Sequence, residues 1–157
     1  MTLLILLALG AALPLFYWVW IWTPKRTRAR REALLQVQGR ASGATFFPVD
    51  PRQALGSWDE TCILFDPDAR KACIVVADKA ARTVDFDYFR TWQLLWTEYP
   101  GNPVFRFQHV HFVFETGDFD RPTIRVAVPS RSDGEAWNVK LSILSPGCAA
   151  EEMGLST

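Results

Sequence analysis

The chain opens with an apolar run that no charged residue interrupts before Lys25. As a helix, residues 1–23 would be about 34 Å long at ~1.5 Å rise per residue, enough to cross a hydrocarbon core of ~30 Å. The pattern therefore predicts a single transmembrane helix over residues 1–23.

Aromatic residues gather at the end of this run, and basic residues follow them at once. Tyr and Trp favour the membrane–water interface, and cytoplasmic flanks carry an excess of Lys and Arg. We therefore expect residues 24–157 to be cytoplasmic and the lipid bilayer to be a partner. The predicted membrane-interface residues are Tyr17, Trp18, Trp20, Trp22, Lys25, Arg26, Arg28, Arg30 and Arg31.

We predict a basic juxtamembrane helical stalk over residues 24–43. It would begin at Pro24 and end near Gly39 and Ser42-Gly43. Residues 44–147 form the predicted folded domain. Residues 148–157 are expected to be a flexible tail.

Within the domain, apolar and β-branched runs alternate with turn residues, which is typical of antiparallel strands. A helical pattern closes the domain, and Ser132 with Glu135 fits a capping box at its start. Strands followed by one helix indicate an α+β fold rather than a parallel sheet. The predicted strands are Thr61–Phe65, Ala72–Ala77, Thr83–Tyr88, Thr91–Tyr99, Val104–Glu115 and Thr123–Val128.

Composition separates the chain into two unlike parts. Of the 157 residues, 49% are hydrophobic and the net charge is zero. Five of the 17 Lys and Arg lie in residues 1–31, so the rest carries 12 basic against 17 acidic side chains. An acidic domain of this kind argues against nucleic acid as a partner.

Residues 60–145 resemble small bacterial membrane-anchored PH-like domains of unknown function, of the DUF4755 type. The resemblance is carried by the Cys62–Asp66 and Cys73–Val76 hairpin and by the segments Asp85–Trp92, Gly117–Pro122 and Glu135–Trp137. It implies a PH-like β domain capped by a C-terminal helix, with a bacterial inner-membrane location. Together with the apolar run, the expected fold is α+β, a transmembrane helix followed by this small antiparallel domain.

His109 and His111 are the only histidines, and two positions apart on a strand they share a face. They are weak candidates for a metal site with Glu115 or Asp118. Without a third histidine we interpret them as ordinary strand residues, and we predict no metal and no cofactor. Three Asp-x-Asp pairs are interpreted as turn or structural residues: Asp66/Asp68, Asp85/Asp87 and Asp118/Asp120.

If the hairpin loop is residues 66–69, Cys62 faces Cys73 across the strands, and either close packing or a disulfide follows. A cytoplasmic location favours reduced thiols. The tryptophans Trp58, Trp92, Trp96 and Trp137 are interpreted as core residues rather than as an exposed binding surface.

The sequence contains no Gly-rich phosphate loop, no G-x-S-x-G and no H-E-x-x-H motif, which leaves no enzyme class with a definable mechanism, and the leading hypothesis is non-enzymatic. The leading hypothesis is a membrane-anchored cytoplasmic interaction module that binds a protein partner or lipid headgroups. One alternative is an accessory subunit of an envelope or mobile-element system whose transmembrane helix contacts other helices through Gly10-Ala11-Ala12. A second alternative is a small metal-binding domain or enzyme that uses His109 and His111.

Overall fold

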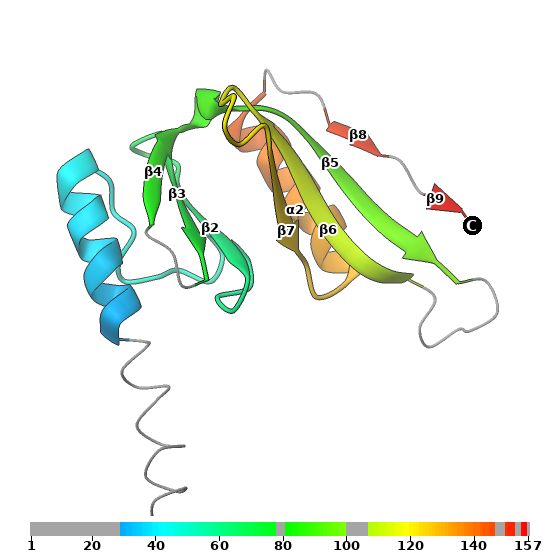
Figure 1. Ribbon diagram of the computed structural model, residues 1–157, viewed down its shortest axis with the longest axis horizontal. Coiled ribbons are helices and arrows are strands. Elements are labelled where there is room, and N and C mark those ends of the chain that lie inside the picture. Colours follow the sequence, from blue (N-terminus) through cyan, green and yellow to red (C-terminus); the bar gives the residue numbers. More distant parts are fainter. Residues whose placement is uncertain (1–28, 78–80, 100–106, 147–149, 153–154, 157) are drawn as a thin grey trace, which may run out of the picture.

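The computed structural model describes residues 29–77, 81–99, 107–146, 150–152 and 155–156 (Figure 1). A helix over residues 29–42 comes first, and two sheets and a second helix follow. The described strands are β1 (Ala54–Gly56), β2 (Thr61–Asp66), β3 (Lys71–Val76), β4 (Arg82–Asp85), β5 (Phe89–Glu98), β6 (Phe107–Thr116), β7 (Thr123–Ala127), β8 (Ala150–Glu152) and β9 (Leu155–Ser156). A short 3₁₀ turn, η1 (Phe86–Tyr88), joins the two sheets, and the second helix is α2 (Arg131–Leu144).

The first sheet has the strand order β1-β2-β3-β4, and all of its pairs are antiparallel. Both faces of its central strands are apolar, because each face is covered. The N-terminal helix and residues 44–49 cover one face, where Leu35, Phe46, Cys62, Leu64 and Cys73 form a buried cluster. Within the range predicted as a stalk, residues 29–42 are helical and pack against this sheet.

The second sheet has the order β7-β6-β5-β8, and β9 also pairs with β5. Strands β5, β6 and β7 are antiparallel, whereas the short β8 and β9 run parallel to β5. The long strands alternate strictly between buried and more exposed positions over much of their length, as a sheet with one covered face requires.

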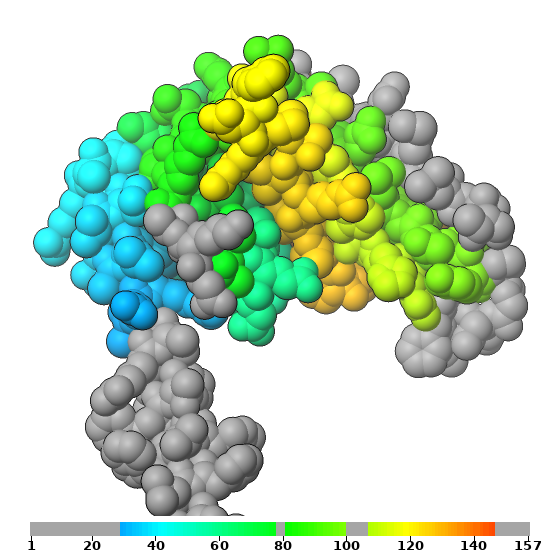
Figure 2. Space-filling model, in the orientation of Figure 1, coloured from blue at the N-terminus to red at the C-terminus, as the bar shows by residue number. Residues whose placement is uncertain are grey.

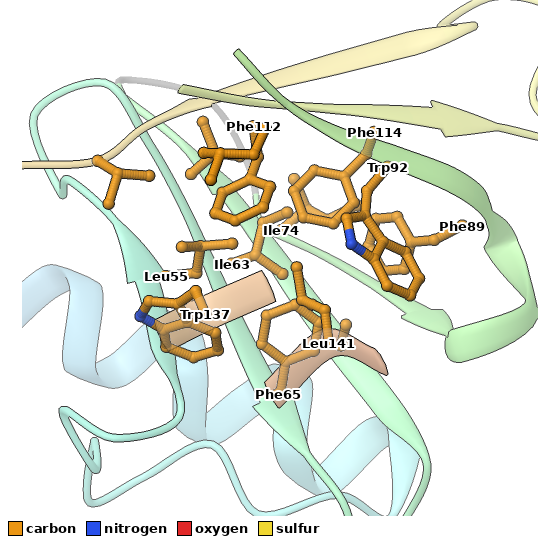
Figure 3. Packing of buried hydrophobic residues seen from close by; sticks show 14 of the residues in the cluster. Leu55, Ile63, Phe65, Ile74, Phe89, Trp92, Phe112, Phe114, Trp137 and Leu141 are labelled. Carbon is orange, nitrogen blue, oxygen red and sulfur yellow. The ribbon is translucent and has the colours of Figure 1, made fainter. Parts of the chain in front are cut away.

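The main core lies between the two sheets, and α2 closes it (Figure 3). Trp92, Phe112 and Phe114 from the second sheet are buried with Leu55 and Ile63 from the first. From α2, Trp137 packs on Phe65 with ring centroids 5.8 Å apart. The indole Nε1 of Trp92 donates a hydrogen bond to Asn138 Oδ1 at 2.9 Å. Trp92, Trp96 and Trp137 are thus core residues, as predicted, whereas Trp58 is partly buried beside the other cluster.

The predicted fold class is wrong. The expected chain was a transmembrane helix followed by one small PH-like antiparallel domain with a single capping helix. In the described residues, seven antiparallel strands are instead divided between two sheets, and two helices pack on them. Strand pairing depends on contacts between distant segments, which local periodicity does not contain.

Within the described part of the chain, no helix is both long and apolar enough to span a membrane. The apolar run of residues 1–23 and the interface residues Tyr17 to Arg28 lie outside the described residues. The transmembrane helix and the location therefore stay predictions from sequence. Of the basic flank, Arg30 is exposed, and Arg31 forms an ion pair with Asp59 at 3.7 Å.

The predicted Cys62–Cys73 pairing is also wrong. The observed register places Cys62 opposite Val75 and Leu64 opposite Cys73. The hairpin loop is residues 67–70, because Asp66 Oδ1 accepts the N–H groups of Asp68 and Ala69, each at 3.1 Å. Arg70 completes the loop with φ of +52°. Both cysteines are free and fully buried on the same sheet face.

The N-cap of α2 is Ser130 rather than the predicted Ser132. Ser130 Oγ accepts the Asp133 N–H at 3.1 Å and donates to Asp133 Oδ2 at 2.7 Å. The predicted capping box is therefore wrong: a serine caps α2 two residues earlier, and Ser132 is an exposed residue of the first turn.

Candidate functional site: a cationic cleft beside the β6–β7 loop

The β6–β7 loop, residues 117–122, is held by its own hydrogen bonds. Thr116 contributes most of them: its N–H donates to Pro122 O at 2.9 Å and its hydroxyl donates to Arg121 O at 2.5 Å. The same hydroxyl accepts the Asp118 N–H at 3.2 Å, and Asp118 Oδ1 accepts the Asp120 N–H at 3.1 Å. These hydrogen bonds give the loop a defined conformation, although its own side chains are not packed in the hydrophobic core.

Asp118 also ties the loop to the first sheet. Arg82 Nη1 donates to Asp118 Oδ2 at 2.7 Å, and the Tyr88 hydroxyl donates to the same oxygen at 3.3 Å. The Arg82 guanidinium also lies over the Tyr88 ring, 5.0 Å from its centroid. Hydrogen bonding from Arg82, and then from the Asp120 N–H, lowers the pKa of the Asp118 carboxyl, and the same pair raises the pKa of Arg82.

Phe119 stands at the tip of this loop, and 99% of its surface is exposed. Because it stays in water, the Phe119 side chain buries no apolar surface when the chain folds. The loop that carries it is nevertheless fixed at both ends by hydrogen bonds. Aromatic residues are enriched at the centres of protein interfaces, where they supply much of the binding energy. In Figure 2 the yellow residues of this region project beside the green surface of β4 and η1.

A cleft of about 220 Å³ lies beside the loop, between the first sheet and β7. Three arginines line it: Arg82 from β4, Arg121 from the loop and Arg125 from β7. The other lining residues are Thr61, Ile74, Val76, Tyr88, Thr123 and Ile124. Ligand pockets for drug-sized molecules measure roughly 300–1,000 Å³, so this cleft suits a smaller group.

Arg121 and Arg125 have no ion pair or side-chain hydrogen bond with any residue that the structure describes. Arg82, in contrast, is engaged by Asp118. The cleft thus combines one arginine fixed by an internal carboxylate with two whose guanidinium groups have no described partner. Arginine binds carboxylates and phosphates through several parallel N–H donors, which makes an oxyanion the fitting ligand.

The predicted histidines lie elsewhere, on the solvent face of β6. His109 has φ of +53° where β6 carries an extra residue opposite β5, and His111 Nδ1 lies 2.6 Å from His109 O. Glu115 shares their face but bonds to Thr91 Oγ1 at 2.9 Å. Among the described residues, no three His, Cys, Asp or Glu side chains come together as a metal site.

The buried cysteines offer no reactive thiol. Burial, followed by the neighbouring Cys73, raises the pKa of Cys62 to about 12, and burial raises the pKa of Cys73 to about 11. At neutral pH both are protonated and pack as small apolar groups.

Sequence reasoning missed the residues that the fold brings together here. Asp118 was interpreted as a turn residue, and its bond to the Asp120 N–H agrees with that. Phe119, Arg121 and Arg125 were not singled out, although an aromatic residue between two aspartates in a Gly-to-Pro turn is an available signal. The nearness of Arg82 could not be read from sequence, because 36 positions separate it from Asp118.

Fold and site together define a small α+β protein with antiparallel sheets and a cationic cleft beside an exposed aromatic loop. Comparison with known proteins finds no matching family model and no significantly similar curated protein or solved structure. The DUF4755-type resemblance therefore stays a prediction from sequence.

Proposed function

We propose that this chain is a non-catalytic interaction module, held at a membrane by the apolar residues 1–23, whose β6–β7 loop docks on a protein partner. The observation that carries the proposal is Phe119, 99% exposed on a loop fixed by hydrogen bonds. Burying a Phe side chain at an interface stabilises a complex by roughly 1.5–3 kcal/mol. A rigid loop adds little ordering cost on binding.

The neighbouring arginines support the same conclusion. Protein interfaces are enriched in aromatic residues and arginine, and these residue types dominate measured binding energies. Phe119, Arg121 and Arg125 lie within seven positions on one loop and its following strand. One compact surface therefore offers both an apolar anchor and positive charge.

The arrangement of the elements favours a protein over the headgroups of the same membrane. In Figure 1 the described chain starts with the dark-blue end of the N-terminal helix at the lower left, whereas the β6–β7 loop lies at the top. Only residues 24–28 separate the apolar run from that start, and five residues reach at most ~18 Å even when extended. The loop would then face away from the membrane that holds the chain.

The test is site-specific photocrosslinking of the full chain in cells. Phe119 is replaced by p-benzoylphenylalanine, and the control carries the same group at Val139, which is 62% exposed on α2. We expect a discrete protein adduct at position 119 and none of that mass at position 139. Lipid adducts alone, or the same adducts at both positions, would overturn the docking proposal.

A further inference from the structure

We infer that the cleft between the first sheet and β7 is a binding site for a phosphate group, carried by a phosphorylated side chain of the partner. The inference rests on the proposed function for the source of the phosphate. The existence of a site is inferred from the residues that line the cleft. The chemistry of its ligand is inferred from the charge of these residues, the number of their hydrogen-bond donors and the size of the cleft.

Charge is the first argument. Residues 32–157 carry 12 basic and 17 acidic side chains, yet three of those 12 cations line one small cleft. Of the carboxylates, Asp118 approaches Arg82, and Arg121 and Arg125 have none among the described residues. Positive charges that line the same cleft attract an anion into it.

Donor number favours phosphate over carboxylate. Each guanidinium has five N–H donors, and Thr61 and Thr123, which also line the cleft, each carry a hydroxyl. A phosphate monoester presents three terminal oxygens and carries about −1.5 to −2 charges at neutral pH, so it can accept from several arginines at once. A carboxylate has two oxygens and one charge, which leaves part of this donor set unused.

Size and position fit a phosphorylated side chain. The cleft volume of about 220 Å³ exceeds the ~30 Å³ of one water several-fold but is below the range of pockets for large ligands. Arg121 is two residues from Phe119, so a partner segment in contact with the aromatic tip can reach the cleft with a neighbouring side chain. The apolar contact and the charged contact would then belong to one interface.

The experiment titrates the purified full chain, in neutral detergent at constant ionic strength, with O-phosphoserine and follows the ³¹P resonance of the ligand. We expect saturable binding that weakens about tenfold or more in Arg121→Gln and in Arg125→Gln, since each loses a charge-assisted hydrogen bond. Arg52→Gln is the matched control, because it removes one exposed positive charge elsewhere and should bind like the parent chain. Unchanged thermal melting shows that the variants fold.

Two further ligands distinguish the sources of phosphate. Inorganic phosphate should compete with O-phosphoserine, whereas glycerophosphoglycerol, the headgroup diester of an anionic lipid, should bind at least threefold more weakly. Tighter binding of the diester would overturn the phosphorylated-side-chain assignment. A non-saturable response, or equal losses in Arg52→Gln, would remove the site altogether.

The phosphate titration and the photocrosslinking experiment can fail independently of each other. Arginine-dependent binding of O-phosphoserine without a protein adduct at position 119 supports the phosphate site and removes the proposed docking role of Phe119. A protein adduct at position 119 without arginine-dependent binding leaves the docking proposal in place and overturns the phosphate site.

Discussion

At the residue scale, Asp118 performs two tasks with one side chain. Its Oδ1 accepts the Asp120 N–H and shapes the loop, while its Oδ2 accepts from Arg82 and Tyr88 and fixes the loop to the first sheet. The ionised form is required for the second task, because a charged acceptor makes the stronger bond to a guanidinium. Loop position therefore depends on the charge of a single carboxylate.

This dependence predicts a pH signature. The folded-state pKa of Asp118 is below its ordinary value of 3.8, so its stabilising contribution is fully present above about pH 4. It is lost as the pH falls through the lower folded-state pKa. We expect Asp118→Asn to melt at a lower temperature than the parent chain at neutral pH, with the difference narrowing below about pH 4. Melting curves over this range check it, and a pH-independent difference would contradict it.

At the element scale, α2 begins where a side chain can satisfy its first free N–H groups. Ser130 does this, whereas the predicted cap Ser132 lies in the first turn. We expect Ser130→Ala to lower the free energy of unfolding by about 1 kcal/mol, and Ser132→Ala to change it by less than ~0.5 kcal/mol. Chemical denaturation followed by circular dichroism measures both, and equal losses would contradict the assigned cap.

The start of the β1–β2 turn depends on Gly56. Its φ is +98°, and an added Cβ would lie 2.3 Å from Thr61 O and 2.4 Å from Val126 Cγ1. Gly43 also has a positive φ, +69°, but nothing lies within 4 Å of the added atom. We therefore expect Gly43→Ala to lower the free energy of unfolding by about 1–2 kcal/mol, the cost of a positive φ for a residue with a side chain. Gly56→Ala should lower it by at least ~1 kcal/mol more, because the new methyl group also clashes with its neighbours. If chemical denaturation gave the two variants similar losses in the free energy of unfolding, the structure around Gly56 would have adjusted to make room for the methyl group.

Several elements could be predicted from sequence because their signals are local. The strand runs around Ile63 and Ile74 and the closing helix around Trp137 lie where periodicity placed them. The register at Cys62 was missed because the Asp66 side chain and the positive φ of Arg70 set a loop one residue later. The split into two sheets and the cleft were missed because they depend on contacts between distant strands.

At the scale of the whole molecule, the first sheet separates two apolar clusters. One face packs under the N-terminal helix, and the other packs against β5–β7 and α2. The cleft and the β6–β7 loop lie where β7 meets the first sheet, so their geometry follows from how the two sheets are held together. The core residues that hold the sheets thus also set the spacing of Arg82 and Arg125.

Trp137 of α2 packs against the first sheet and so helps to hold this arrangement. It is 9% exposed, packs on Phe65 of β2, and carries the Lys140 ammonium 4.4 Å from its ring centroid. Trp137→Ala removes the ring contact of α2 with Phe65 of the first sheet and leaves a cavity, so we expect a loss of about 3–5 kcal/mol in the free energy of unfolding. Val139→Ala, on the exposed side of the same helix, should keep a free energy of unfolding within about 0.5 kcal/mol of the parent chain.

The same Trp137→Ala variant should also bind O-phosphoserine more weakly at temperatures where it is still folded, because the two sheets would be joined less firmly. Denaturation and ³¹P titration of the same samples measure both effects, and a large stability loss with unchanged binding would show that the cleft keeps its shape without α2.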